Sequence, residues 1–307
     1  MPTYQDISRH TSNVVADPEI SQDIWAKTLE ESAFMQLARQ INIPGTGTKI
    51  QTITGEPTAN WVDETNPKPV SASTFGAKTI VPYKLAVIEP FSTEFLRDKK
   101  ALYDECVRRA PAALGKKFDA TIMGSTAPGS GFDVLGTGVG TQTILAASGH
   151  TVYSRFVDAD ATISAADGIL NAIALAPQGK SIVLGAEDST GHPLFTAGVG
   201  SNVVGSILGA SVAINKGVYV AGTAATQSAA GVPAIVGVAG DFSGVMWGSV
   251  EGVKISVSDQ ASLVDANSNT INLWQSNMVA VRFEIEVAFA VMDKGQLVLL
   301  TGETPSS

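Results

Sequence analysis

Cysteine, histidine and charged residues are all scarce in this sequence. Its 307 residues include one cysteine, Cys106, and three widely separated histidines, His10, His150 and His192. We therefore expect no intramolecular disulfide, no multi-cysteine zinc site and no paired-histidine metal motif. Charged residues make up 16% of the chain and the net charge is -9, whereas proteins that grip DNA use clustered Lys and Arg. These absences argue against a metal, a cofactor and sequence-specific DNA binding.

Signals for export and for membrane insertion are missing too. The first twenty residues contain Asp6, Asp17 and Glu19 and no apolar run, which predicts no secretory signal. Residues 189–215 carry no charged side chain, but glycine, serine, threonine and asparagine interrupt them too often for a helix that crosses a bilayer. We expect neither export nor membrane association.

Enzyme motifs are incomplete. The chain has no G-x-S-x-G elbow. Gly179-Lys180-Ser181 has the ending of a phosphate-binding loop, but that motif needs glycine at position 174, which is alanine. Glu187 and Asp188 follow an apolar run and could form an acid pair in a cleft, although acids in such places more often cap a following helix. We expect no enzymatic activity, and a hydrolase acting through Glu187 and Asp188 is the alternative.

The residues that are abundant favour a folded chain rich in turns and strands. Apolar residues make up 44% and there are 30 glycines, enough for a sizeable core with many tight turns. Asp17, Pro18 and Glu19 are typical of a helix start, and the predicted helix runs to Ile43 with a break near Ser32. Residues 1–47 would then form an N-terminal arm.

An extended hairpin is expected over residues 48–91. Residues 49–54 and 79–88 are rich in Ile, Val, Thr and Tyr, which predicts two paired strands. The polar stretch 55–77 between them is too long for an ordinary connection in a compact domain, so we expect it to contact another subunit or to pack back on its own. Its candidate inter-subunit contacts are Trp61, Glu64, Lys68 and Phe75.

The longest helix is expected after residue 92. Apolar residues spaced by three or four form one stripe: Tyr103, Val107, Ala110, Leu114, Phe118 and Ile122. Pro111 lies inside this pattern, so we expect it to bend or break the helix. Four basic residues on this helix are candidates for contact with an acidic partner surface or form a solvated helix face: Arg108, Arg109, Lys116 and Lys117.

The second half of the sequence combines helix and strand patterns. A helix is predicted over 161–174, capped by Asp158 or Asp160, and short strands over 181–184, 217–221, 234–238 and 253–257. Apolar residues occupy every second position from Val279 to Val291, which predicts an unusually long strand. A short strand over 296–301 completes an α+β fold.

Five short motifs occur in a fixed order along the first half: Trp61-Val62-x-Glu64, Ser71-x-Ser73-x-Phe75, Lys84-Leu85-Ala86, Phe91-Ser92-x-Glu94-Phe95-Leu96-x-Asp98, and Phe118-Asp119-Ala120-x-x-x-Gly124 followed by Pro128 and Gly131. Their order, from loop tip to returning strand to helix, resembles the major capsid proteins of tailed bacteriophages with the Hong Kong 97-like fold. The resemblance covers residues 32–135 and 278–301.

This resemblance implies a shell protein built from four parts. They are an N-terminal arm (1–47), an extended loop (48–91), a peripheral domain with a long spine helix (92–157 and 250–294) and an axial domain (158–249 and 295–307). The implied function is self-assembly into pentamers and hexamers of an icosahedral shell around double-stranded DNA. An encapsulin-like compartment of the same fold is an alternative.

The resemblance also implies the surroundings in which such a protein works. Expected partners are further copies of the chain, a portal, a scaffolding protein and cement proteins. Assembly is expected in the host cytoplasm and the final location is the virion capsid.

Overall fold

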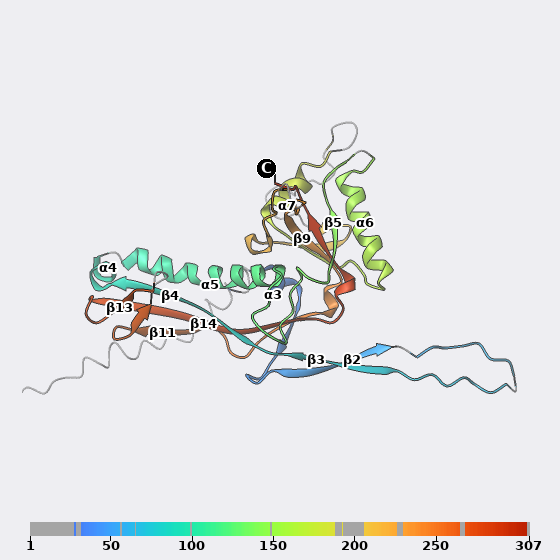
Figure 1. Cartoon of the computed structure of the whole chain (residues 1–307), viewed down its shortest axis with the longest axis horizontal. Coiled ribbons are helices and arrows are strands. Elements are labelled where there is room, and N and C mark those ends of the chain that lie inside the picture. The colour runs from blue at the N-terminus through green and yellow to red at the C-terminus, as the bar shows by residue number, and fades with distance from the viewer. Residues whose placement is uncertain are drawn as a thin grey trace, which may run out of the picture.

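The computed structural model shows an elongated α+β molecule (Figure 1). It has a long five-stranded sheet, a body built on a six-stranded sheet, and a projecting hairpin. The structure describes residues 28, 32–55, 57–64, 66–98, 100–147, 149–187, 192, 206–225, 230–264 and 268–305. Figure 1 shows helix α5 lying lengthwise along the long sheet. The hairpin β2–β3 extends from the end of the molecule opposite to α4.

Strand β14 (Met278–Val291) is the centre of a five-stranded sheet. One of its edges pairs antiparallel with β4 (Tyr83–Ser92). Along the opposite edge, the first half of β14 pairs antiparallel with β11 (Lys254–Ser258) and its last part pairs antiparallel with β10 (Val245–Ser249). Strand β1 (Arg39–Asn42) pairs with β10 in parallel. The long C-terminal strand expected from the alternating apolar residues is confirmed.

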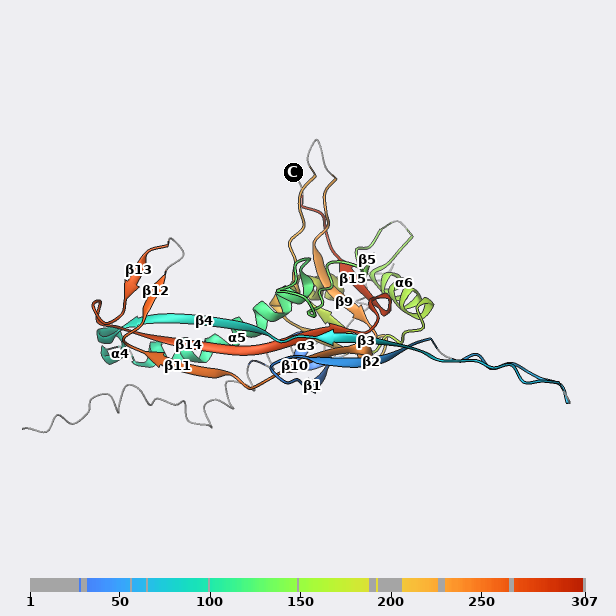
Figure 2. The same ribbon diagram turned by 60° about the horizontal axis from the view of Figure 1, so that its bottom comes forward.

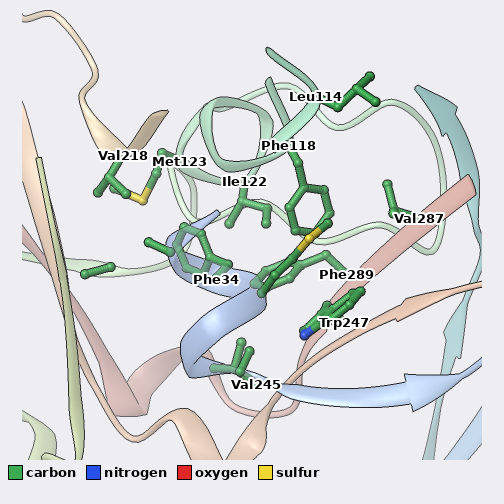
Figure 3. Packing of buried hydrophobic residues seen from close by; sticks show 14 of the residues in the cluster. Phe34, Leu114, Phe118, Ile122, Met123, Val218, Val245, Trp247, Val287 and Phe289 are labelled. Atoms are coloured by element: carbon green, nitrogen blue, oxygen red, sulfur yellow. The ribbon is translucent and has the colours of Figure 1, made fainter. Parts of the chain in front are cut away.

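Helix α5 (Lys100–Met123) covers one face of this sheet and follows the short helix α4 (Thr93–Asp98). Leu114, Phe118 and Ile122 are buried, because the helical period places them on one stripe. Figure 3 shows this stripe packed over Phe34 and Phe289, with Trp247 beneath. The ring centroids of Phe118 and Phe289 lie 6.3 Å apart, and those of Phe34 and Phe289 lie 5.5 Å apart. The predicted stripe is correct where the structure describes its side chains.

The second sheet has six strands in the order β5-β15-β9-β6-β8-β7. Their bounds are Gly140–Thr143, Leu297–Thr301, Ile235–Gly240, Ala172–Leu175, Ala210–Ile214 and Ser206–Ile207. Helices α6 (Val152–Ala165) and α7 (Pro177–Leu184) share a buried cluster with one face of this sheet. Residues of the other face belong to the main core, so the two sheets are joined through a common apolar interior.

Short elements complete the fold. Strands β12 (Ser262–Val264) and β13 (Thr270–Asn272) form a small hairpin at the end of the long sheet that lies beside α4 (Figure 2). Within the described residues, 3-10 turns occur at Lys216–Val218 (η1), Phe242–Gly244 (η2) and Lys294–Gln296 (η3). Each begins after Asn or Asp whose side chain accepts a backbone N–H, as turn-forming residues do.

The helix expected to run to Ile43 is wrong in its last part. Helix α3 spans only Ala33–Leu37, with Ser32 as its N-cap. Residues 39–42 form β1 instead, because pairing with β10 satisfies their backbone groups and outweighs local helical preference. The start of that helix at Asp17 lies outside the described residues.

The hairpin prediction is right in its first strand and wrong in the extent of its second. Strand β2 (Thr48–Gly55) pairs with β3 (Thr74–Ile80). The run 79–88 is divided at Val81 and Pro82, because proline lacks a backbone N–H, and the residues after it pair with β14.

Three further predictions in the second half need correction. The helix expected over 161–174 lies earlier, at α6, where Thr151 caps it in place of Asp158 or Asp160. The strand expected over 181–184 is part of helix α7, and the strand expected over 217–221 is not formed, because η1 occupies its first two residues. Short apolar runs fit a buried helix as well as a strand, which explains the α7 error. The strands near 234–238 and 253–257 are confirmed as β9 and β11.

The two sheets also divide the chain differently from the expected domain bounds. The expected peripheral range 92–157 includes strand β5 and the first residues of α6, yet these pack in the six-stranded body. The expected axial range 158–249 includes strand β10, yet this strand pairs with β14 in the long sheet. Secondary-structure patterns do not specify which sheet a strand joins, because that depends on contacts between distant residues.

Candidate assembly surfaces

The hairpin β2–β3 exposes large apolar side chains to solvent. Trp61 is 105% exposed, Val70 97% and Phe75 75%, and Glu64 and Lys68 are exposed too. Figure 2 shows the hairpin reaching far beyond both sheets. The alternative that Trp61 packs back on its own subunit is therefore wrong. Exposed apolar groups of this size are typical of interaction sites.

The base of the hairpin is fastened firmly to the body. Lys78 Nζ lies 2.6 Å from Asp133 Oδ2 and also donates to the carbonyl of Val291. Asp133 Oδ2 in turn accepts the N–H of Val291 at 2.8 Å. Gly131, with φ +79°, accepts the N–H of Val81 through its carbonyl at 3.1 Å. An ion pair and several hydrogen bonds thus anchor the base of the hairpin, its root, to the body. The sequence did not predict these contacts.

The basic candidates on α5 line one open side of that helix. The side chains of Arg109, Lys116 and Lys117 are exposed, whereas that of Arg108 lies outside the described residues. Lys116 and Lys216 border a cleft of about 690 Å³ between α5 and the six-stranded body, floored by Ala112, Ala113, Pro177 and Ile214. Lys116 and Lys216 thus lie at the same cleft, whereas the hairpin β2–β3 extends away from α5 (Figure 1).

Pro111 does not break helix α5. The helix is continuous from Lys100 to Met123 with the proline inside it and buried. The break that the sequence allowed is therefore wrong. A proline ring in a helix interior removes one backbone hydrogen bond and crowds the preceding turn, so a bend at this position stays a prediction.

In the part of the chain that the structure describes, the candidate catalytic residues do not form a site. Glu187 is exposed, and Asp188 lies outside the described residues. Gly179-Lys180-Ser181 lies within helix α7, and a Cβ at Gly179 would come 2.6 Å from the carbonyl of Val236. This glycine therefore serves close packing, not phosphate binding. Among the described residues no cluster of three or more His, Cys, Asp or Glu could hold a metal, and no described helix is long and apolar enough to span a membrane.

One buried carboxyl was missed by sequence reasoning. Asp119 on α5 is fully buried, and its oxygens accept hydrogen bonds from the Ser32 hydroxyl at 2.6 Å and from the N–H of Ala33 at 2.8 Å. Burial raises the pKa of Asp119 to about 7, against the opposing effect of these donors. The available signal was an acid next to Phe118 on the apolar stripe of a helix, a position that points towards the core.

The polar face of the long sheet carries paired charges. Lys84 Nζ lies 2.9 Å from Glu284 Oε1 and 3.2 Å from Glu286 Oε1, across the β4–β14 pairing. The hydrogen bond from Lys84 lowers the pKa of Glu284, and the same bond raises the pKa of Lys84. Exposed ion pairs of this kind contribute little to the stability of the fold, so we interpret this face as ordinary solvent-exposed surface.

Comparison with known proteins resolves what this arrangement is. The model of the phage capsid family matches residues 12–302. The chain belongs to the phage capsid family. It is therefore a structural protein of a virion capsid, present in many copies, and the assembly of a shell is its function.

Individual relatives of the phage capsid family agree with this. The chain is 32% identical to the probable major capsid protein gp17 of Mycobacterium phage L5, over 93% of this chain and 88% of that protein. It is 30% identical to the corresponding protein of Mycobacterium phage D29, over 93% and 89%. A solved structure from Mycobacterium phage Bobi superposes with a TM-score of 0.71 at 22% identity, covering 89% of this chain and 91% of that one. The Hong Kong 97-like α+β fold is thus confirmed.

Proposed function

We propose that this chain is the major capsid protein of a tailed phage and that it assembles into pentamers and hexamers of an icosahedral shell around double-stranded DNA. The observation that carries the proposal is the β2–β3 hairpin. The hairpin exposes Trp61 and Phe75 to solvent, and an ion pair between Lys78 and Asp133 anchors its base to the body. An isolated subunit gains nothing from this arrangement, whereas a neighbour that covers the hairpin would bury both rings.

The inter-subunit contacts follow from exposure and charge. Trp61 and Phe75 supply apolar area, and buried aromatics at interfaces often contribute about 2 kcal/mol or more each. Glu64 and Lys68 on the same loop supply polar contacts. Arg109, Lys116 and Lys117, together with Arg108, form the second candidate surface, suited to an acidic partner surface. Each contact is repeated in every subunit of a shell, so weak contacts add up.

The four-part division is retained with bounds adjusted to the sheets. We assign the extended loop to residues 48–80 and the peripheral domain to the long sheet with α5. The axial domain is the six-stranded body. The N-terminal arm ends before α3. A portal, a scaffolding protein and cement proteins are the proposed partners, assembly takes place in the host cytoplasm, and the chain catalyses no reaction.

The direct test is to purify the chain and measure what it forms. Gel filtration and electron microscopy should show closed icosahedral particles of megadalton mass, with capsomers of five and six subunits. A small stable oligomer would contradict the proposal and reopen the hydrolase reading. The contents of particles from infected cells separate the remaining alternative, since DNA supports a capsid and a packaged enzyme supports an encapsulin-like compartment.

A further inference from the structure

Three parts of the fold meet at a single buried carboxyl. Asp119 lies near the end of α5, one residue after Phe118, and is 0% exposed. Its Oδ1 accepts the Ser32 hydroxyl at 2.6 Å and its Oδ2 accepts the N–H of Ala33 at 2.8 Å. The 3-10 turn η1 of the six-stranded body packs on the other side. A Cβ at Gly217 of η1 would lie 2.8 Å from the Cβ of Asp119.

The contact fastens the start of α3 to helix α5. Ser32 donates to Asp119 and at the same time accepts the N–H of Met35 at 3.2 Å, so one hydroxyl caps α3 and binds α5. Phe34, two residues later, enters the aromatic core beside Phe289. Losing the Asp119 contact would therefore free the start of α3 from the spine helix while leaving the core rings in place.

No described residue forms an ion pair with the Asp119 carboxyl. The charged side chains that the structure describes on the packed elements are Arg109, Lys116 and Lys117 on α5 and Lys216 on η1, and all four are exposed. Helix α3 carries no charged residue. Burial therefore dominates and raises the pKa of Asp119 to about 7, while hydrogen bonds from Ser32, Ala33 and Phe34 lower it by less.

We propose that the Asp119–Ser32 contact is a proton-sensitive latch between the start of α3 and helix α5. With Asp119 protonated, the closed joint holds no buried charge. Once the carboxyl is ionised, the closed joint keeps an uncompensated charge out of water, whereas opening at Ser32 hydrates it. Opening is therefore easier at higher pH. This inference concerns the subunit alone and does not depend on the arrangement of any shell.

The sign of the pH effect follows from linkage. In the closed state the pKa is about 7, and in water it is the ordinary 3.8. A group whose pKa is raised on folding stabilises the folded state fully below its unfolded pKa, and this contribution disappears as the pH rises through the folded pKa. The latch should be firmest below the open-state pKa of 3.8, should weaken as the pH rises from there to about 7, and should change little above that pH.

The test is hydrogen exchange at the Ala33 and Phe34 amides of the full chain, from about pH 5 to about pH 8, corrected for the intrinsic pH dependence of exchange. In the wild type, protection should fall as the pH rises. In Asp119→Asn, which has similar shape and no ionisation, protection should be independent of pH. Asp133→Asn is the matched control, because it removes another hydrogen-bonded carboxyl and should leave the pH dependence at Ala33 intact.

A second variant keeps the carboxyl and moves its titration. Ser32→Ala removes a donor that favours the ionised form, so the fall in protection at Phe34 should shift to higher pH. This variant decides the question if Asp119→Asn does not fold. Identical pH profiles at Phe34 in the wild type and Ser32→Ala would overturn the proposal, and so would a wild-type profile that does not change with pH.

Discussion

The core around Phe289 and the tip of the β2–β3 hairpin belong to one chain but are stabilised in different ways. Phe289 is fully buried, within ring-contact distance of Phe34 and Phe118. Trp61 at the tip is fully exposed. The first region makes the subunit fold, because burial of large apolar side chains is the main driving force of folding. The second contributes nothing to that folding, so its apolar residues must be explained by other molecules.

The largest effect is expected from Phe289→Ala in the core. Removing the ring leaves a cavity beside Phe34 and Phe118, and such changes cost about 3–5 kcal/mol. That is a large share of the stability of a typical domain. Chemical denaturation of the purified chain should show a strongly lowered midpoint or no folded subunit. A variant of normal stability would mean that this cluster is not the centre of the core.

An intermediate effect is expected at the root of the hairpin. Lys78→Ala removes the ion pair with Asp133 and the hydrogen bond to the Val291 carbonyl, and should cost about 1–2 kcal/mol because both side chains are mostly buried. Lys84→Ala is the control, since it removes a more exposed pair and should change the midpoint of unfolding very little. Equal effects of the two variants would show that the root is not specially fastened.

A smaller effect of opposite sign is expected in α5. Pro111→Ala restores the missing backbone hydrogen bond, worth about 1 kcal/mol. The subunit should therefore melt slightly higher, while the shape of its particles changes if the proline sets a bend. Electron microscopy of the assembled variant measures this. Particles of normal size and yield would show that the proline has no part in shell geometry.

The smallest effect on the subunit is expected at the hairpin tip. Trp61→Ala should leave the unfolding free energy of the unassembled chain within about 0.5 kcal/mol of the wild type, because the ring touches nothing there. Its effect should appear only in particle yield, which should fall sharply. Circular dichroism melts together with gel filtration measure both quantities. A large loss of subunit stability with assembly intact would contradict the contrast between tip and core.

Local periodicity was sufficient for much of the fold. The alternation from Val279 to Val291 matches β14 to within one residue, and the spacing of Leu114, Phe118 and Ile122 matches the buried stripe of α5. Both patterns are long, and long patterns specify one period. The short apolar runs at 172–175 and 181–184 could not be resolved in this way, because four residues fit either a strand or a helix.

Contacts between distant residues were not predictable from the sequence. Strand β1 depends on a parallel partner some two hundred residues away in β10, which no local pattern encodes. The assembly candidates on the hairpin followed from the length and polarity of the loop. All four side chains are exposed, and their contact with another subunit stays a prediction. Asp119 was missed for the opposite reason, since its partner Ser32 comes from a different element and its burial depends on the packing of η1.

The independence of the hairpin tip from the core has a consequence for how such sequences diverge. Selection for folding acts on Phe34 or Phe289 in every subunit, whereas at residues 57–64 and 66–73 it acts only through whatever covers the loop. Where one subunit meets another, a substitution at Trp61 can be answered by a substitution in the neighbour's surface without any change in the core. The tip should therefore vary in step with its binding surface among relatives. It is also the place where a foreign peptide could be inserted with the subunit's own folding left intact.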